Sequence, residues 1–451
     1  MRDATRNMTE GSPAKHIIGF ALPMLLGLLF QQLYNMADTM IVGKWLGVEA
    51  LAAVGSVGSV NFMVIGFCIG VCSGFAIPVA REFGAEDYRA LRRFVANSVW
   101  ISAVLAVVMT VSVCLLCRNI LVLMKTPADI IDRAYSYIFI IFLGIPVTYL
   151  YNLLSGIIRS LGDSRSPVVF LLISSVINIV LDIVSVKFLH TGVEGPAAAT
   201  VISQFISGIL CLVYICKRFL ILRIEKDEWK PDKKYIMQLF SMGLPMGLQY
   251  SITAIGSVIL QSAVNTLGSS VVAAVTAGSK VNMFFCCPFD ALGGTMATFA
   301  GQNIGAGKPK RIKRGVGSAA LIGAVYSAIA FTVLYFFGRN AALIFLDAEE
   351  TEILSHAVRF LFTNSLFYFP LSLLLVFRFT VQGMGYSSLA VFAGVTEMIA
   401  RIVIAFGLVP VFGFNAVCYA NPVSWVSAAV FLIGAFFYCL RQSVKKGKRT
   451  E

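Results

Sequence analysis

Four acidic residues stand well inside long apolar stretches of the sequence: Asp38, Asp182, Asp290 and Glu397. A charged side chain at the centre of a lipid bilayer costs about 2.5–3.5 kcal/mol on insertion scales, and more in simulations. A carboxylate in such a place is a candidate for proton or cation chemistry. These four residues are therefore the first candidates for a functional site.

Asp38 belongs to a polar stripe within an apolar segment. Gln31, Tyr34, Asn35 and Asp38 are spaced i, i+3, i+4 and i+7, which places them on one face of a helix. A structural hydrogen-bond network and a site that faces a water-filled cavity both explain such a stripe. The carboxylate favours the functional interpretation, because an uncharged amide would complete a network at lower cost.

A second amide–carboxylate pair lies in the motif NIVLDIV, where Asn178 and Asp182 are one helical turn apart. If Asp38 and Asp182 come together, their mutual repulsion and their burial both favour a protonated carboxyl group. Their oxygens and the side chain of Asn178 would equally suit Na⁺, because hard cations prefer oxygen ligands. The sequence therefore predicts an ion-coupling site for H⁺ or Na⁺, with Asp38, Asn178 and Asp182 as metal ligands in the sodium case. No other cofactor is expected.

The remaining two acids lie in the second half of the chain. Glu397 and Arg401 are spaced i, i+4 with the acid first, which is the favourable orientation for an ion pair within a helix. This spacing favours a structural pair over a cavity-lining one. Asp290 follows Pro288 in the motif PFDALGG, where a helix can open, and the sequence shows no partner for it. A structural role and contact with a substrate or ion both remain open for Asp290.

Membrane-spanning helices must position these residues, because 58% of the 451 residues are hydrophobic and only 13% are charged. Soluble domains average about 45–50% apolar and about 25% charged residues. Twelve apolar segments approach or exceed the ~20 residues that span a bilayer as a helix. The predicted fold is an all-α polytopic membrane protein. Its expected spans are 16–42, 51–79, 94–117, 134–158, 167–189, 195–216, 236–263, 270–300, 315–337, 353–378, 388–411 and 416–440.

The sequence also repeats itself at an offset of 221–223 residues. FGAEDYRALRRFV at 83–95 aligns with IGAGKPKRIKRGV at 304–316, and ALPM with GLPM. Because each half holds an even number of spans, the halves are parallel repeats, related by a pseudo-twofold axis along the membrane normal. The expected domains are an N-lobe (1–220), a charged cytoplasmic linker (221–235), a C-lobe (236–441) and a basic cytoplasmic tail (442–451).

Some residues occur at matching positions in both halves of the repeat, and others occur in only one half. Pro23 and Pro245 stand at matching points of the first helix of each half, where they can bend it, and Pro23 is the predicted hinge. The acidic pair is not shared, since Leu260 aligns with Asp38 and Arg401 with Asn178. The sequence therefore predicts an ion site in the N-lobe alone.

The net charge of +13 follows from the loops. With the N-terminus inside, twenty-six Lys and Arg residues fall on the inner side and six on the outer side. This bias predicts a multi-pass protein of the plasma or inner membrane with both termini in the cytoplasm. Membrane lipids are the expected partners of these basic residues, and nucleic acid is not.

No motif supports catalysis. Cys114 and Cys117 form a CxxC within an apolar helix end, without a second pair or a nearby His to complete a metal site. GQNIGAGKP resembles a phosphate-binding loop, but it is one residue too long and Pro309 replaces the Ser or Thr that would hold Mg²⁺. The chain is therefore not expected to be an enzyme or an ATPase.

Several longer motifs resemble those of multidrug and toxic compound extrusion (MATE) transporters. They are ALPMLLGLLFQQLYNMADTMIVGKWLG, RSLGDSRSP, GLPMGLQYSI and FAGQNIGAGKPKRIKRG, and the resemblance covers nearly all of residues 15–441. It implies a twelve-helix, two-lobed antiporter that extrudes organic cations and other amphipathic compounds, driven by inward H⁺ or Na⁺.

The resemblance also indicates a branch of the family. The DinF-like branch builds its N-lobe cation site from five residue types, which are matched here by Tyr34, Asp38, Asn178, Asp182 and Thr200. The NorM-like branch instead carries a Glu eight residues after the proline of helix 7, where this chain has Thr253. The DinF-like site is therefore the expected one, and the roles of Tyr34 and Thr200 rest mainly on the resemblance.

The predicted function is a monomeric antiporter that exports amphipathic, mostly cationic drugs or toxic compounds by alternating access. The alternative is a lipid-linked oligosaccharide flippase of the same superfamily, which would need a basic cavity for a pyrophosphate. The few intramembrane Lys and Arg residues favour cationic cargo. The expected lining of the substrate cavity comprises Gln31, Asn35, Asn61, Gln261, Asn282, Asp290 and Glu397.

Overall fold

The computed structural model describes residues 5–124 and 126–447, and these residues form helices and connecting loops without a β-strand. The all-α fold class is therefore confirmed. The helices are α1 (Pro13–Leu46), α2 (Val48–Ser56), α3 (Gly58–Gly84), α4 (Tyr88–Leu123), α5 (Ile131–Leu143), α6 (Ile145–Ser160), α7 (Arg165–Ile183), α8 (Glu194–Arg218), α9 (Lys233–Asn265), α10 (Ser269–Gly305), α11 (Pro309–Ala342), α12 (Thr351–Leu366), α13 (Tyr368–Gly383), α14 (Ser387–Val403), α15 (Val409–Phe412) and α16 (Phe414–Gly447), with π-helical segments at Val184–Phe188 and Ile404–Leu408 and a 3₁₀ turn at Leu220–Leu222.

Within the described residues, ten helices are long and apolar enough to cross a membrane, and two bent pairs bring the total to twelve. The bent pairs are α5 with α6, at 44°, and α12 with α13, at 52°. The sequence predicts each pair as one continuous span, at 134–158 and 353–378, and the bends were not predicted. The breaks fall at Gly144 and Phe367, shortly before Pro146 and Pro370. A proline near the break explains the bend, because it lacks the N–H that would continue the helix.

The chain divides into two compact units whose limits lie inside helices. Unit 1 holds the described residues up to Asn7 together with Leu26–Gly247, and unit 2 holds Met8–Leu25 with the described residues from Leu248 onward. The first part of α1 thus packs with the second half of the chain, and the first part of α9 packs with the first half. Each limit falls two residues after a proline, Pro23 in α1 and Pro245 in α9.

In unit 1, glycines allow the first part of α9 to approach α3 closely. A Cβ atom on Gly74 would lie 2.5 Å from the Cα atom of Gly243, and one on Gly70 would lie 2.6 Å from the carbonyl oxygen of Met246. Gly70 and Gly74 are spaced like Gly243 and Gly247, so each helix presents the small-xxx-small pattern of close helix pairs in membranes. This contact fixes the start of α9 to unit 1.

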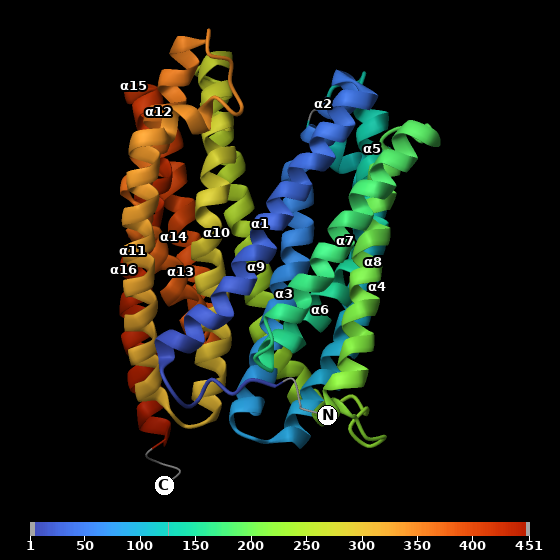
Figure 1. Cartoon of the computed structure of the whole chain (residues 1–451), viewed down its shortest axis with the longest axis vertical. Coiled ribbons are helices and arrows are strands. Elements are labelled where there is room, and N and C mark those ends of the chain that lie inside the picture. Colours follow the sequence, from blue (N-terminus) through green and yellow to red (C-terminus); the bar gives the residue numbers. More distant parts are fainter. Residues whose placement is uncertain (1–4, 125, 448–451) are drawn as a thin grey trace. The chain divides into compact units, whose positions relative to one another are not determined.

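In unit 2, α13 contacts each of the other helices of a group that comprises α10, α11, α12, α14 and α16 (Figure 1). Phe289, Tyr326, Tyr368 and Trp425 stack in edge-on and tilted pairs within its core. The same core contains Phe20 from the first part of α1. Ala393 of α14, the helix that carries Glu397 and Arg401, belongs to this core, and α14 packs against α13 and α16.

The glycine-rich motif of unit 2 holds the polypeptide that precedes α1. Gln302 accepts the amide N–H of Met8 at 2.9 Å, and Asn303 donates to the Met8 carbonyl at 3.4 Å. Arg311 donates to the carbonyl oxygens of Met8, Glu10 and Gly11 at 2.7–3.3 Å. The motif that resembles a phosphate loop therefore binds backbone carbonyls of its own chain.

The matching segment of unit 1, at the start of α4, holds the polypeptide that precedes α9. Arg92 forms two hydrogen bonds to the buried carboxylate of Glu228, at 2.7 and 2.8 Å, and they hold the pKa of Glu228 below its usual range. Asn97 accepts the backbone N–H of Asp232 at 2.9 Å. The charged linker at 221–235 is thus docked on unit 1 through its acids.

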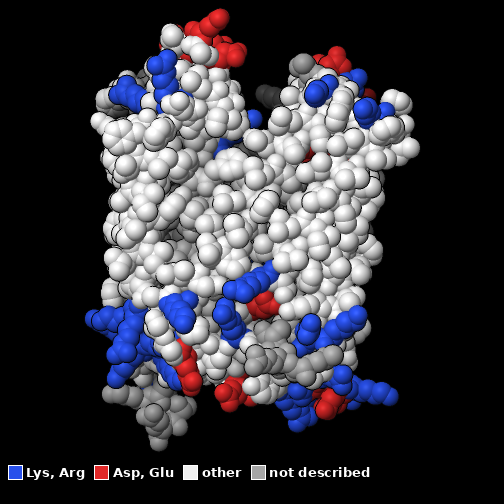
Figure 2. Space-filling model, in the orientation of Figure 1, with Lys and Arg blue, Asp and Glu red and all other residues white. Residues whose placement is uncertain are grey.

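Charges and apolar side chains separate along the helices in both units (Figure 2). Most Lys and Arg side chains gather at one end of each unit, and the band beyond them is largely free of charge on the face shown. Large apolar side chains such as Leu115, Leu123, Phe336 and Phe406 are more than 60% exposed, as expected of lipid-facing positions. A multi-pass membrane protein is confirmed, and cytoplasmic termini stay a prediction. Four of the Lys and Arg residues that predict the orientation in the membrane lie outside the described residues: Arg2, Lys125, Lys448 and Arg449.

Candidate functional site

The site begins with α7, which carries Asn178 and Asp182 one turn apart at the interior of unit 1. Asn178 is 1% exposed and Asp182 is fully buried. Among the described residues, neither side-chain atom of Asn178 and neither carboxyl oxygen of Asp182 has a hydrogen-bond partner. Buried polar atoms are nearly always partnered in folded proteins, so this cluster of free oxygens points to a bound ion, proton or water.

The second part of α1 brings Asp38 to the same place. The side chains of Asp38 and Asp182 lie close enough to interact, and Oδ1 of Asp38 is buried without a partner. Gly27 of α1 lies against Val168 of α7, because a Cβ on this glycine would be 2.9 Å from the valine methyl group. The small residue lets the two helices approach and so brings the two acids together.

Two tyrosines border the acids. Tyr34 lies one turn before Asp38, interacts with Gln31 and is within electrostatic range of both aspartates. Tyr137 of α5 is 7% exposed and lies within range of Asp38, Tyr34 and Asp182. Tyr137 is not among the site residues predicted from the sequence, because it lies in an apolar helix where a tyrosine is as common in packing as in binding.

Thr200 lies on α8, which packs against α7 through the hydrogen bond from Ser174 to the carbonyl of Ser203 at 2.7 Å. Thr200 is half-buried, and its hydroxyl donates to the carbonyl of Pro196 on its own helix at 3.0 Å. The structure therefore places Thr200 on the helix that packs against α7. Its hydroxyl proton is already donated to a carbonyl of its own helix.

The backbone changes form directly after Asp182. The α-helix ends at Ile183 and a five-residue π-helix, Val184–Phe188, follows. A second π-helix, Ile404–Leu408, follows α14 in unit 2. Such segments are rare and occur frequently at functional sites. Both halves of the chain thus carry the same irregularity beside their buried charged residues.

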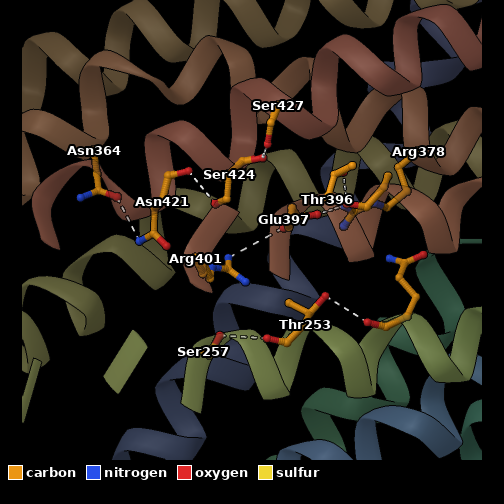
Figure 3. A network of polar contacts seen from close by, with 12 residues as sticks. Thr253, Ser257, Asn364, Arg378, Thr396, Glu397, Arg401, Asn421, Ser424 and Ser427 are labelled. Carbon is orange, nitrogen blue, oxygen red and sulfur yellow. Dashed lines mark hydrogen bonds and ion pairs between the residues drawn. The ribbon is translucent and has the colours of Figure 1, made fainter. Parts of the chain in front are cut away.

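The unit 2 counterpart is a cluster of one acid and two bases (Figure 3). The predicted ion pair between Glu397 and Arg401 is confirmed at 3.8 Å. Glu397 also receives a hydrogen bond from Arg378 of α13, and all three residues are at most 6% exposed. Spacing along the chain could not reveal Arg378, since it comes from a different helix.

The other expected cavity residues are spread over both units. In unit 1, Gln31 and Asn61 are half-buried and Asn35 is exposed. In unit 2, Asn282 accepts a hydrogen bond from Tyr368 at 2.7 Å, and the exposed Gln261 donates to Asn265 at 2.9 Å. Asp290 is exposed on α10 and within electrostatic range of Arg378. Their place in a substrate cavity stays a prediction.

The site of unit 1 can bind a small cation. Two carboxyl groups and one amide converge in a buried place, and four of their oxygens have no partner in the described structure. Close carboxylates cannot both stay charged in such a place without compensation. A proton on one carboxyl group, or a Na⁺ ion among the oxygens, would each offset part of this negative charge. The residues therefore fit either ion.

A single family model matches the chain twice, once in each half of the sequence repeat. The MatE family model matches residues 23–184 and again residues 245–406. The two matches cover more than half of the chain. Each match ends within the π-helical segment of its own half.

Individual relatives span most of the chain. "Probable multidrug resistance protein YoeA" of Bacillus subtilis (strain 168) is 30% identical over 359 residues, which is 78% of each protein. "Probable multidrug resistance protein YpnP" of the same strain is 29% identical over 310 residues, which is 68% of each.

The fold also matches solved structures. An outward-facing "multidrug resistance MATE family transporter of the MOP superfamily" superposes with a TM-score of 0.88 at 23% identity over 98% of both chains. A MOP superfamily transporter from Pyrococcus furiosus, described as having a binding pocket of reverse polarity, reaches a TM-score of 0.90 at 23% identity and equal coverage. At this identity the likeness shows the fold.

Proposed function

The chain belongs to the MatE family of membrane transporters, and from this membership we propose that it is a secondary active antiporter. It exports amphipathic, mostly cationic compounds in exchange for H⁺ or Na⁺ moving inward. It works as a monomer in the plasma or inner membrane with both termini in the cytoplasm. The relatives named as multidrug resistance proteins support this cargo class.

One observation carries the proposal: the carboxyl groups of Asp38 and Asp182 lie within interaction range of each other, and three of their four oxygens are buried without a hydrogen-bond partner among the described residues. Buried acids of this kind mark ion pathways in membrane proteins. A purely structural role would leave them hydrogen-bonded, because an unsatisfied buried polar group lowers stability. We therefore assign the coupling ion to this pair, with Asn178, Tyr34 and Thr200 around it.

The mechanism follows from charge. An ion arriving from the outside removes one of the two negative charges of the pair, and the free energy cost of burying the pair falls. The second part of α1, which carries Asp38, can then approach α7 more closely, and bending at Pro23 allows this without moving the first part of α1. The cavity of unit 1 narrows and the compound leaves to the outside. Return of the ion to the inside resets the charge.

Unit 2 supplies no second ion site in this account. Arg401 and Arg378 place two positive charges next to Glu397, and these repel a small cation. Thr253, half-buried on α9, uses its hydroxyl on the carbonyl of Gln249 at 3.0 Å. One exchanged ion site per transporter is expected.

The flippase alternative rests on a basic cavity, and Arg378 and Arg401 are the basic residues that would serve it. Glu397 contacts both of them, which lowers the positive charge offered to a pyrophosphate. The antiporter is therefore the better-supported function.

The test is transport by the purified protein in liposomes. Efflux of a fluorescent organic cation is followed under an inward pH gradient alone and then under an inward Na⁺ gradient alone. Protein-free liposomes and protein without a gradient are the controls. We expect one gradient to drive efflux, and that gradient names the ion. Efflux under neither gradient would reject the antiporter and favour the flippase.

A further inference from the structure

The short loop between α6 and α7 borders a cavity at one end of unit 1. The cavity has a volume of about 400 Å³, and its lining includes Arg6, Asp163, Arg165 and Tyr214. All of the lining residues belong to unit 1. Both arginines are exposed, and among the described residues neither guanidinium group has an ion pair or a hydrogen bond. Two cations without a partner in the described structure thus line an open cavity.

The one acid of this lining, Asp163, already has its own partners. One carboxylate oxygen accepts the backbone N–H groups of Arg165 and Ser166 at 2.9 and 3.1 Å. The other accepts the hydroxyl groups of Ser166 and Tyr214 at 2.6 and 2.9 Å. Two arginines and one aspartate leave the lining with one excess positive charge. The guanidinium donors therefore remain available to an anion from outside the chain.

The wall of the cavity is held in place by contacts of the backbone and of aromatic rings. The backbone N–H of Arg6 donates to the carbonyl of Leu161 at 2.8 Å. Gly162 has a φ of +91°, and a Cβ atom there would clash with the carbonyl oxygen of Arg6. The ring of Tyr214 packs edge-on against Phe170 of α7, with 5.5 Å between the ring centroids. A ligand would thus meet a site that is already formed, which reduces the entropic cost of binding.

Arg165 also stands at the start of an apolar stripe on α7. Val169, Ile173, Val176 and Val180 follow it at i+4, i+8, i+11 and i+15, which places all five residues on one face of the helix. The four apolar side chains are 43–63% exposed. The same helix face therefore offers a cation at its end and an exposed apolar surface beyond it, which is the pattern of a phospholipid with its phosphate and its acyl chain.

A second cavity of unit 1 has a similar size but a different charge. It has a volume of about 410 Å³ and lies at the opposite end of α8, where its lining includes Asp132, Arg133 and Glu194. Arg133 is paired with Glu49 at 2.8 Å. Two acids and one paired arginine do not attract an anion. Cavity size alone thus does not distinguish the two places, whereas the unpaired arginines do.

We propose that the cavity at Arg6 and Arg165 binds the headgroup phosphate of an anionic phospholipid, whose acyl chain lies along the apolar stripe of α7. A guanidinium group holds its N–H donors in a plane that matches a phosphate. Basic pockets at the cytoplasmic ends of membrane helices bind anionic headgroups, and the orientation proposed above places this end of unit 1 in the cytoplasm. A soluble phosphate compound would use the arginines and leave the stripe unoccupied.

This site is separate from the ion and cargo sites of the proposed function, but α7 connects it to one of them. Asn178 and Asp182 lie on the opposite face of α7 from Arg165. A lipid held at Arg165 would therefore attach the helix of the ion site to the adjoining leaflet of the membrane.

Native mass spectrometry of the purified full-length protein in neutral detergent tests the proposal. The probes are dioleoylphosphatidylglycerol and dioleoylphosphatidylcholine, which have the same acyl chains but differ in net charge. The measured quantity is the ratio of their dissociation constants for the first bound lipid. The variants are Arg6→Gln and Arg165→Gln, with Arg223→Gln as the control for loss of an exposed arginine of unit 1 that does not line the cavity. Thermal unfolding of each variant shows that it is folded.

We expect the wild type to prefer phosphatidylglycerol at least about tenfold, and each cavity variant to lower this preference about fivefold, since each arginine near a membrane surface contributes separately. Arg223→Gln should keep the preference of the wild type. Equal binding of the two lipids by the wild type, or an equal loss in all three variants, would overturn the proposal. Arg6 and Arg165 come from separate segments, so either variant tests the site if the other does not fold.

A second arm separates a lipid from a soluble phosphate. Inorganic phosphate and glycerophosphoglycerol, which is the same headgroup without acyl chains, are each added at the concentration of the lipid. Unchanged binding of phosphatidylglycerol supports the proposal. Displacement of the lipid by either compound would assign the cavity to a soluble phosphate and overturn it. The assay contains no gradient and no cargo, so its failure is distinct from failure of the antiport assay.

Discussion

The carboxyl groups of Asp38 and Asp182 lie within interaction range of each other, although one is on α1 and the other on α7. Both are located in unit 1, and the oxygens of Asp182 have no partner among the described residues. The protein therefore keeps an arrangement that its own contacts do not stabilise. An account based on ion binding explains why such an arrangement persists.

The first prediction concerns the stability cost of this pair. We expect Asp182→Asn to leave thermal stability unchanged or to raise it by about 1 kcal/mol, because the amide has nearly the same shape and avoids a buried charge. The measurement is thermal unfolding in detergent at pH 7.5.

Asp163→Asn is the matched control, because the Asp163 carboxylate has four hydrogen bonds, from the amides of Arg165 and Ser166 and the hydroxyls of Ser166 and Tyr214. It should lower stability by about 1–2 kcal/mol. A loss in Asp182→Asn as large as in Asp163→Asn would mean that Asp182 is structural.

Bending of α1 gives the second prediction. The limit between the compact units falls two residues after Pro23, so the two parts of α1 belong to different units. Pro23→Ala should straighten and stiffen the helix, and it should slow gradient-driven efflux about tenfold while the protein stays folded. Pro245→Ala should act in the same direction, because α9 changes unit in the same way.

Pro422 lies inside α16, all of which belongs to unit 2, and Pro422→Ala is the control. Its efflux rate should match that of the wild type. An unchanged rate in Pro23→Ala, or an equal slowing in Pro422→Ala, would reject the hinge.

The close contact between α3 and α9 gives the third prediction. A Cβ on Gly74 would meet the backbone of Gly243, which cannot rotate away. Gly74→Ala should therefore destabilise the protein by about 1–3 kcal/mol through overpacking. Gly434→Ala in α16 is the control, because nothing lies within 4 Å of the added carbon, and it should gain up to about 1 kcal/mol from helix propensity. Thermal unfolding of the two variants in parallel measures their changes in stability relative to wild type. A change of the same sign in both variants would contradict the prediction.

The docked linker gives a prediction about pH. The hydrogen bonds from Arg92 lower the pKa of Glu228 in the folded protein. A carboxyl whose folded pKa is lowered adds stability above its unfolded pKa of about 4.3, and this stability is lost as pH falls through the folded pKa. Glu228→Gln should therefore lower stability by about 1–3 kcal/mol at pH 7, and the difference from wild type should shrink below about pH 4.

Glu349→Gln serves as the control for this pH series, because Glu349 lies exposed in the loop before α12. Its unfolding curve should follow the wild type at both pH values. A difference between Glu228→Gln and wild type that stays constant from pH 7 to pH 4 would show that the carboxylate charge does not hold the linker.

Residue type and local spacing were enough to predict the spans and the main acids. The cost of burying charge identified Asp38 and Asp182 without any knowledge of the fold, and the repeat located Pro245 from Pro23. The pair between Glu397 and Arg401 followed from an i, i+4 spacing, which depends on one helix alone.

Contacts between distant segments could not be predicted in this way. Arg378 reaches Glu397 from another helix, and Tyr137 reaches the acids from α5. The role of Arg311 was hidden for the same reason, since its partners lie about 300 residues away near the N-terminus. Sequence spacing carries no information about which helices meet, so these residues required the fold.

Gradient-driven efflux by wild type and Asp38→Asn, compared side by side, tests the central claim most directly. Both proteins are reconstituted at equal density, and efflux of the fluorescent cation is measured under the gradient that drives the wild type. The account predicts that Asp38→Asn loses gradient-driven efflux while remaining folded. Efflux by Asp38→Asn at the wild-type rate would contradict the account, because the coupling ion would then bind elsewhere.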